Sequence, residues 1–220
     1  MLAAVFALAM VVDGPPQTRP GPSDSAPADS EPSGVADLGD DDAMAGGSMS
    51  AVIAACRTEW AAQTVPLRSA RRALAQWRVH VEAMNRLVAG EITLELASAF
   101  WARTRVGAAR RVERFEAAAG ALAATSALCR RAATDTGTAA EERTLGSCVV
   151  GNRARSQVLA AAETSVGTWR HHIHDMELFR TGRLSAEQAT QMWEESWRSG
   201  LAELEAYDAA ARRAARQPAC

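Results

Sequence analysis

Apolar and polar positions in residues 51–220 recur at three- and four-residue intervals, the spacing of one face of an α-helix. One apolar stripe is formed by Leu74, Trp77, His80, Met84, Leu87 and Val88. Gly90 follows it and predicts a left-handed helix C-cap, and Thr93 then offers an N-cap for a second helix. This stretch therefore predicts a helical hairpin with its tip at Gly90.

The hairpin pattern occurs twice, at a constant offset of 92 residues. The octad W-R-V-H-V-E-A-M at 77–84 returns as W-R-H-H-I-H-D-M at 169–176. The same offset pairs further residues: Gly90 with Gly182, Thr93 with Ser185, and Trp101 with Trp193. In the second copy Gln188 also completes a capping box. A gapless repeat of this length predicts a duplicated helical hairpin, with repeats at about 56–129 and 148–220.

The second helix of each copy is expected at about 94–129 and 186–217. Its inward positions are expected to be Ala97, Trp101, Val112 and Phe115, matched by Ala189, Trp193, Leu204 and Tyr207. Pro66 should kink or restart the first helix. A short polar join at 132–140 makes neighbouring helices antiparallel. We therefore predict an all-α fold, an up-down-up-down four-helix bundle with both tips at one end.

The N-terminal region differs from the rest of the chain. Residues 1–12 are apolar, with the length of a signal-peptide core and too short to span a bilayer, although no basic segment precedes them and no clear cleavage site follows. Residues 13–50 are rich in Pro, Ser, Asp and Gly and predict a disordered acidic linker. Residues 51–220 form the bundle. We expect an extracytoplasmic protein, secreted or tethered to a membrane by residues 1–12.

Four cysteines lie at matching distances from the two predicted tips. If each glycine marks a tip, Cys56 is level with Cys129, and Cys148 with Cys220. This symmetry favours one disulfide at the open end of each hairpin, among the three possible connectivities. Free thiols in a reducing compartment are the alternative, which the signal-like N-terminus disfavours.

The charge pattern argues against a nucleic-acid partner. Residues 1–50 hold eight acidic residues and one basic residue, Arg19, whereas residues 51–220 hold 23 Arg against 18 acidic residues. The arginines are dispersed along the helices, as on a solvated face, and no basic block is present. Nucleophile elbows, phosphate loops, zincin motifs and Cys-x-x-Cys are absent as well, so we expect no enzymatic activity.

The repeated His and Met are candidate metal ligands. Ten residues separate each His from its tip glycine, so His80 and His172 should lie at the same depth, with Met84 and Met176 one turn nearer the tips. The predicted ligands are His80, Met84, His172 and Met176, within an aromatic wall of Trp77, Trp101, Trp169 and Trp193. Imidazole and thioether form a soft set suited to Cu(I). This palette resembles the Trp-capped His/Met sites of periplasmic copper chaperones, in side-chain types alone.

Other interpretations remain open at this stage. The same Trp, His and Met spacing is typical of plain core packing in a structural or interaction domain of the cell envelope. A haem between His80 and His172 would be crowded by the indoles, and a di-iron site lacks the Glu-x-x-His pattern. His171, His174 and Asp175 occur only in the second copy and are expected at the surface.

Overall fold

The computed structural model describes residues 48–123, 129 and 137–220, and this part of the chain is all-helical. Its helices are α2 (Met49–Ala62), α3 (Thr64–Val88), α4 (Leu94–Arg105), α5 (Ala108–Ala123), α6 (Ala139–Arg180) and α7 (Ala186–Ala214). The predicted signal-like segment, nearly all of the acidic linker and most of the join at 132–140 lie outside the described residues. None of these six helices is long and apolar enough to cross a membrane.

Helices α2 to α5 form the first hairpin. The chain restarts between α2 and α3 at Gln63, three residues before Pro66, as predicted. A second break was not predicted. Val106 is extended and Gly107 has φ +70°, so the helix expected from residue 94 onward is split into α4 and α5. The buried Gln76 side-chain amide donates to the carbonyls of Thr104 and Val106 and thereby satisfies two backbone groups that the break leaves free.

The hairpin tips have the predicted caps. Gly90 and Gly182 both have φ +73°, and in each the next residue donates its N–H to the carbonyl five positions back. Thr93 caps α4, and Ser185 with Gln188 forms the capping box of α7. These local motifs satisfy the helix-end groups that have no partner inside the helix.

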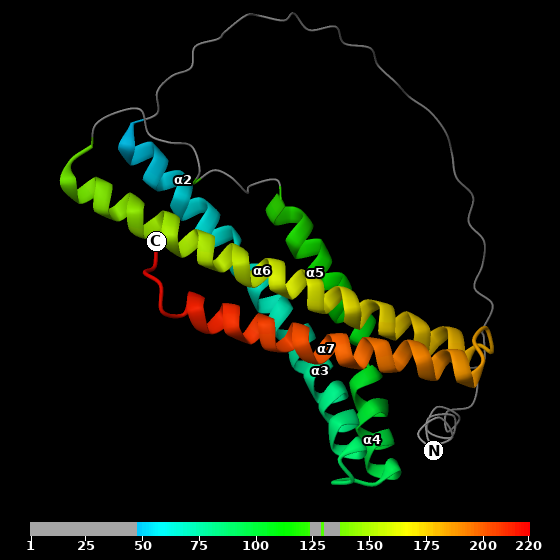
Figure 1. Ribbon diagram of the computed structural model, residues 1–220. Helices are drawn as coiled ribbons and strands as arrows, with labels where there is room; N and C mark the ends of the chain where they lie inside the picture. The colour runs from blue at the N-terminus through cyan, green and yellow to red at the C-terminus, as the bar shows by residue number, and fades with distance from the viewer. Residues whose placement is uncertain (1–47, 124–128, 130–136) are drawn as a thin grey trace, which may run out of the picture.

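Helices α6 and α7 form the second hairpin, and the two hairpins cross. In Figure 1 the α3–α4 tip lies at the bottom and the α6–α7 tip at the right, so the two tips diverge and the molecule is forked. Away from the tips, α2 packs on α6, and α5 packs on α3 and α6. Helix α7 contacts α3. A bundle with both tips at one end is therefore too simple a description, because crossing helices diverge beyond their point of contact.

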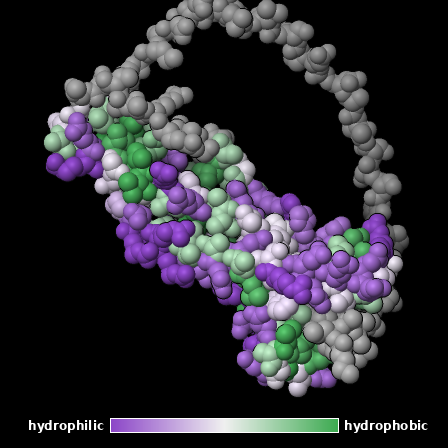
Figure 2. Space-filling view, in the orientation of Figure 1, coloured by the Kyte–Doolittle hydropathy of each residue, from purple (hydrophilic) through white to green (hydrophobic). Residues whose placement is uncertain are grey.

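The core lies where the hairpins cross. It contains the inward positions expected from the periodicity, including Val112, Phe115, Leu204 and Tyr207. Figure 2 shows hydrophilic side chains over most of the visible face, with smaller apolar areas near its two ends. The Trp, His and Met positions of both octads are buried.

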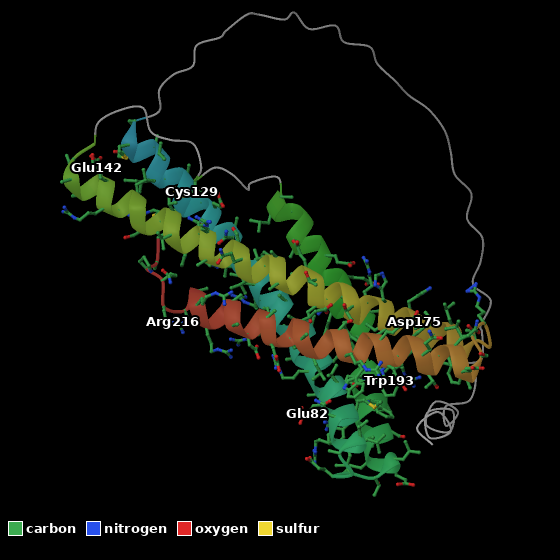
Figure 3. All side chains as sticks on the ribbon, viewed as in Figure 1. Glu82, Cys129, Glu142, Asp175, Trp193 and Arg216 are labelled. Carbon is green, nitrogen blue, oxygen red and sulfur yellow. A yellow bond between two sulfur atoms is a disulfide. The ribbon has the colours of Figure 1, made fainter. Side chains whose placement is uncertain are left out.

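Each hairpin is closed by one disulfide, as the cysteine spacing predicted. Cys56 is bonded to Cys129 and Cys148 to Cys220, and Figure 3 labels Cys129 beside α2. The two bonds pack in one cluster, where the Asn152 side-chain amide donates to the carbonyls of Cys56 and Cys148. Two structural disulfides are typical of proteins that fold in an oxidising compartment.

Replacing the tip glycine is expected to destabilise the second hairpin. Gly182→Ala should lower the free energy of unfolding by about 1–2 kcal/mol, because its φ of +73° disfavours a side chain. Gly167→Ala, inside α6 with open space at the Cβ position, should raise it by up to about 1 kcal/mol. Urea unfolding of both variants checks the difference, and a loss of equal size in both would contradict the cap assignment.

Candidate metal site

The two repeated histidines meet at the crossing of the hairpins. His80 lies on α3 and His172 on α6, and each is only 1% exposed. Their Nε2 atoms are 3.1 Å apart and their ring centroids 5.0 Å apart. The sequence placed the two imidazoles at one depth, and in the structure they are in direct contact.

Each imidazole has a hydroxyl partner at its other nitrogen. Thr104 Oγ1 on α4 lies 2.8 Å from His80 Nδ1, and Ser196 Oγ on α7 lies 3.1 Å from His172 Nδ1. Both hydroxyls follow their histidine by 24 residues. Sequence reasoning missed this pair, although the offset of 92 residues aligns Thr104 with Ser196.

The four predicted tryptophans surround the imidazoles. Trp77 and Trp169 stack with ring centroids 4.7 Å apart, and each lies within 6 Å of both histidine rings. Trp101 and Trp193 meet edge to face at 4.8 Å and border the pair as well. Figure 3 labels Trp193 on α7, where this helix passes the first hairpin. The imidazoles thus lie in a buried aromatic box.

The two methionines are buried in different apolar clusters. Met84 packs in the cluster that contains Trp101 and Trp193. Met176 belongs to the main core cluster, with Trp77 and Trp169. Of the four predicted ligands, the structure therefore brings the two imidazoles into contact and places each thioether in a cluster that includes part of the box.

Burial keeps both imidazoles neutral. Desolvation lowers the pKa of His80 to about 3. Desolvation, and then the charge that His80 would carry, lower the pKa of His172 well below its ordinary value of 6.5. A neutral imidazole is the form that donates a lone pair to a metal ion.

Among the residues that the structure describes, no carboxylate or thiolate joins the two imidazoles at this site. Across residues 48–123, 129 and 137–220, no three His, Cys, Asp or Glu side chains are grouped as a metal site. His171 and His174 are exposed on α6, as predicted, and Asp175 is partly buried beside them. Any ion at the crossing would therefore depend on two imidazoles and on soft donors such as thioethers.

Contacts between the hairpins are reciprocal. Arg78 pairs with Asp208 at 2.8 Å, and Arg170, 92 residues after Arg78, pairs with Glu116 at 2.9 Å, 92 residues before Asp208. A second reciprocal set joins the side chains of Gln63 with Ser156 and Arg155 with Thr64, each at 3.1 Å. If residue i contacts j while the equivalent of j contacts the equivalent of i, the interface has the pattern of a two-fold axis.

Three pairs of equivalent residues contact each other directly, namely His80 with His172, Trp77 with Trp169, and Trp101 with Trp193, so the site lies on that axis. Comparison with protein-family models, with curated proteins and with solved structures finds no match for this chain.

Proposed function

We propose that this chain is a non-enzymatic, extracytoplasmic binding domain that holds Cu(I) between His80 and His172. The observation that carries the proposal is the arrangement of the four ring nitrogens. Both Nδ1 atoms face hydroxyl groups, and both Nε2 atoms face each other at 3.1 Å. Metal-bound imidazoles commonly have this arrangement, in which one nitrogen binds the metal and the other donates to an oxygen.

The distance between the two Nε2 atoms suits one shared ion. Bonds from a metal ion to imidazole nitrogen are about 2.0–2.1 Å long, so two such nitrogens lie about 3–4 Å apart, depending on the angle at the ion. The observed 3.1 Å is at the short end of this range. Small rotations of the two rings would open the pair for an ion.

The donor set favours Cu(I) over harder or more highly coordinated ions. Zn²⁺ in proteins is generally four-coordinate, and Ca²⁺ and Mg²⁺ need six or more oxygen ligands. Cu(I) is soft and accepts low coordination numbers, so two imidazoles with a thioether from Met84 or Met176 would suffice. The indole faces of the box also favour a bound cation.

The reciprocal contacts support a duplicated-hairpin architecture, which we include in the proposal. Each repeat would supply half of the site: one His, one hydroxyl residue and two Trp. An ion on the axis would then join the two hairpins at their crossing. The two disulfides, one in each repeat, support an oxidising location for the domain.

A structural role for the same residues is the second candidate, and one observation favours it. At 3.1 Å, a single N–H from one Nε2 to the other forms an ordinary hydrogen bond. The pair could then be a satisfied polar contact inside the core of an envelope domain. Metal titration separates the two functions.

The oxidised protein is expected to bind one Cu(I) per chain in competition with a chromogenic chelator. The double variant His80→Gln/His172→Gln should bind at least a hundredfold more weakly, because it removes both nitrogen ligands. His171→Gln/His174→Gln is the matched control, since it removes two exposed imidazoles from α6, and it should bind as the wild type does. Failure of the wild type to compete with a weak chelator would contradict the copper proposal and leave the structural role.

A further inference from the structure

The two hydroxyl groups beside the imidazoles also lie within hydrogen-bond distance of two backbone carbonyls each, in their own helix. Thr104 Oγ1 lies 2.9 Å from the carbonyl of Phe100 and 3.1 Å from that of Trp101. Ser196 Oγ lies 3.1 Å from the carbonyls of Met192 and Trp193. A carbonyl oxygen can only accept, and a hydroxyl has one proton, so each hydroxyl is placed to donate that proton back into the helix turn.

The hydroxyl lone pairs therefore face the imidazoles. With its proton directed to the helix carbonyls, each hydroxyl oxygen can only accept from the ring nitrogen beside it. In that orientation His80 Nδ1 and His172 Nδ1 carry the ring proton, and each Nε2 carries a lone pair. A neutral imidazole in water prefers the opposite tautomer, so the hydroxyls oppose the ring's own preference.

We infer that Thr104 and Ser196 are positioning residues that fix both histidines as Nδ1–H tautomers and direct both Nε2 lone pairs to one point. The inference rests on the proposed function for the identity of the ion. The preference of each hydroxyl for the Nδ1–H tautomer of its own ring follows from the hydrogen bonds, and it is measurable without metal once the other imidazole is replaced. In each hairpin, the hydroxyl that sets the tautomer lies on the helix that faces the histidine. Thr104 on α4 faces His80 on α3, and Ser196 on α7 faces His172 on α6.

When no ion is bound, the two Nδ1–H tautomers would leave two Nε2 lone pairs facing each other, which is unfavourable. Two lone pairs cannot face each other at 3.1 Å without repulsion, so one ring must hold its proton on Nε2. The hydroxyl beside that ring must then turn from its carbonyl and donate to Nδ1. A bound ion would remove the conflict: the proton on Nε2 would move to Nδ1 of the same ring, each ring would keep one proton, and the turned hydroxyl would again donate to its carbonyl.

The tautomer of a single imidazole tests the inference directly. In the full chain carrying His172→Phe, ¹⁵N chemical shifts should show His80 as the Nδ1–H tautomer. Adding Thr104→Val should change it to the Nε2–H form, and Thr104→Ser should keep Nδ1–H. If His172→Phe does not fold, the mirror set His80→Phe with Ser196→Ala gives the same result for His172. An unchanged tautomer after removal of the hydroxyl would overturn the inference.

Copper affinity gives the second measurement. Thr104→Val and Ser196→Ala should each weaken Cu(I) binding by about 10–100-fold, the usual loss when the partner of a ligand is removed. Thr104→Ser should restore wild-type affinity. Thr190→Val is the matched control, because Thr190 on α7 is also buried and donates to a carbonyl one turn back. Unchanged affinity in both hydroxyl variants would count against a positioning role, whereas a wild type that binds no Cu(I) would contradict the proposed function and leave the tautomer test valid.

Discussion

The metal-free protein is expected to lose folding free energy steeply as the pH falls from about 6 to about 4.5. Folded His80 and His172 remain neutral in this range, because burial lowers the pKa of His80 to about 3 and that of His172 well below 6.5. In the unfolded chain both imidazoles regain a pKa near 6.5 and bind protons. The unfolded state therefore binds about two more protons, and acid favours it.

The size of this effect follows from proton linkage. Each group that is protonated only in the unfolded state lowers the free energy of unfolding by about 1.4 kcal/mol per pH unit, so the pair contributes about 3 kcal/mol per unit. Stability is fully present above pH 6.5 and is lost as the pH falls toward the folded pKa values. Glu95, Glu141 and Glu177, whose pKa values are lowered by hydrogen bonds, add to the loss as the pH approaches the ordinary glutamate pKa of 4.5, so the difference between the wild type and His80→Gln/His172→Gln isolates the imidazoles.

Urea unfolding of the metal-free protein at several pH values measures the slope. His80→Gln/His172→Gln should abolish the imidazole contribution, and His171→Gln/His174→Gln should retain it, because the latter pair is exposed. If the free energy of unfolding changed equally with pH in the wild type and in His80→Gln/His172→Gln, the prediction would be wrong, because the buried imidazoles would then not differ from the unfolded chain in proton binding.

The helix caps at the hairpin tips were predictable because a cap depends on only a few neighbouring residues. Gly90, Gly182, Thr93 and Ser185 form caps that depend on a few neighbouring residues, and all four are as predicted. Counting residues from the tips also placed His80 level with His172 and each Cys level with its partner. Such counting succeeds because an α-helix has a fixed rise per residue.

The parts that were not predicted depend on packing between hairpins. The break at Gly107 has no equivalent at position 199 of the continuous α7, and it is stabilised by Gln76 from another helix. The divergence of the tips depends on how the hairpins cross, which periodicity does not determine. Thr104 and Ser196 were missed because short hydroxyl residues on a helix carry no chemical signal until a neighbouring ring is placed beside them.

Trp77 is the residue whose loss should weaken the crossing most. It is fully buried and stacks on Trp169, and α7 passes so close that a Cβ added to Gly200 would lie 2.5 Å from Trp77 Cζ2. Trp77→Ala should lower the free energy of unfolding by about 3–5 kcal/mol, since a large cavity would open between the hairpins. Thermal or urea unfolding measures this loss.

Gly200 should be coupled to Trp77. Gly→Ala inside a helix ordinarily stabilises by up to about 1 kcal/mol, and Gly146→Ala on α6, with open space at its Cβ, is the control for that gain. Gly200→Ala should instead destabilise by about 1–3 kcal/mol, because the methyl group overlaps the indole.

In a Trp77→Phe background, which removes the overlapping ring carbons, the penalty of Gly200→Ala should disappear. The double-mutant cycle then gives a coupling energy of the same size as the penalty. A penalty that persists without the indole would place its origin elsewhere. If the coupling is found, the absence of a side chain at position 200 is what allows the second hairpin to close the aromatic box around the histidine pair.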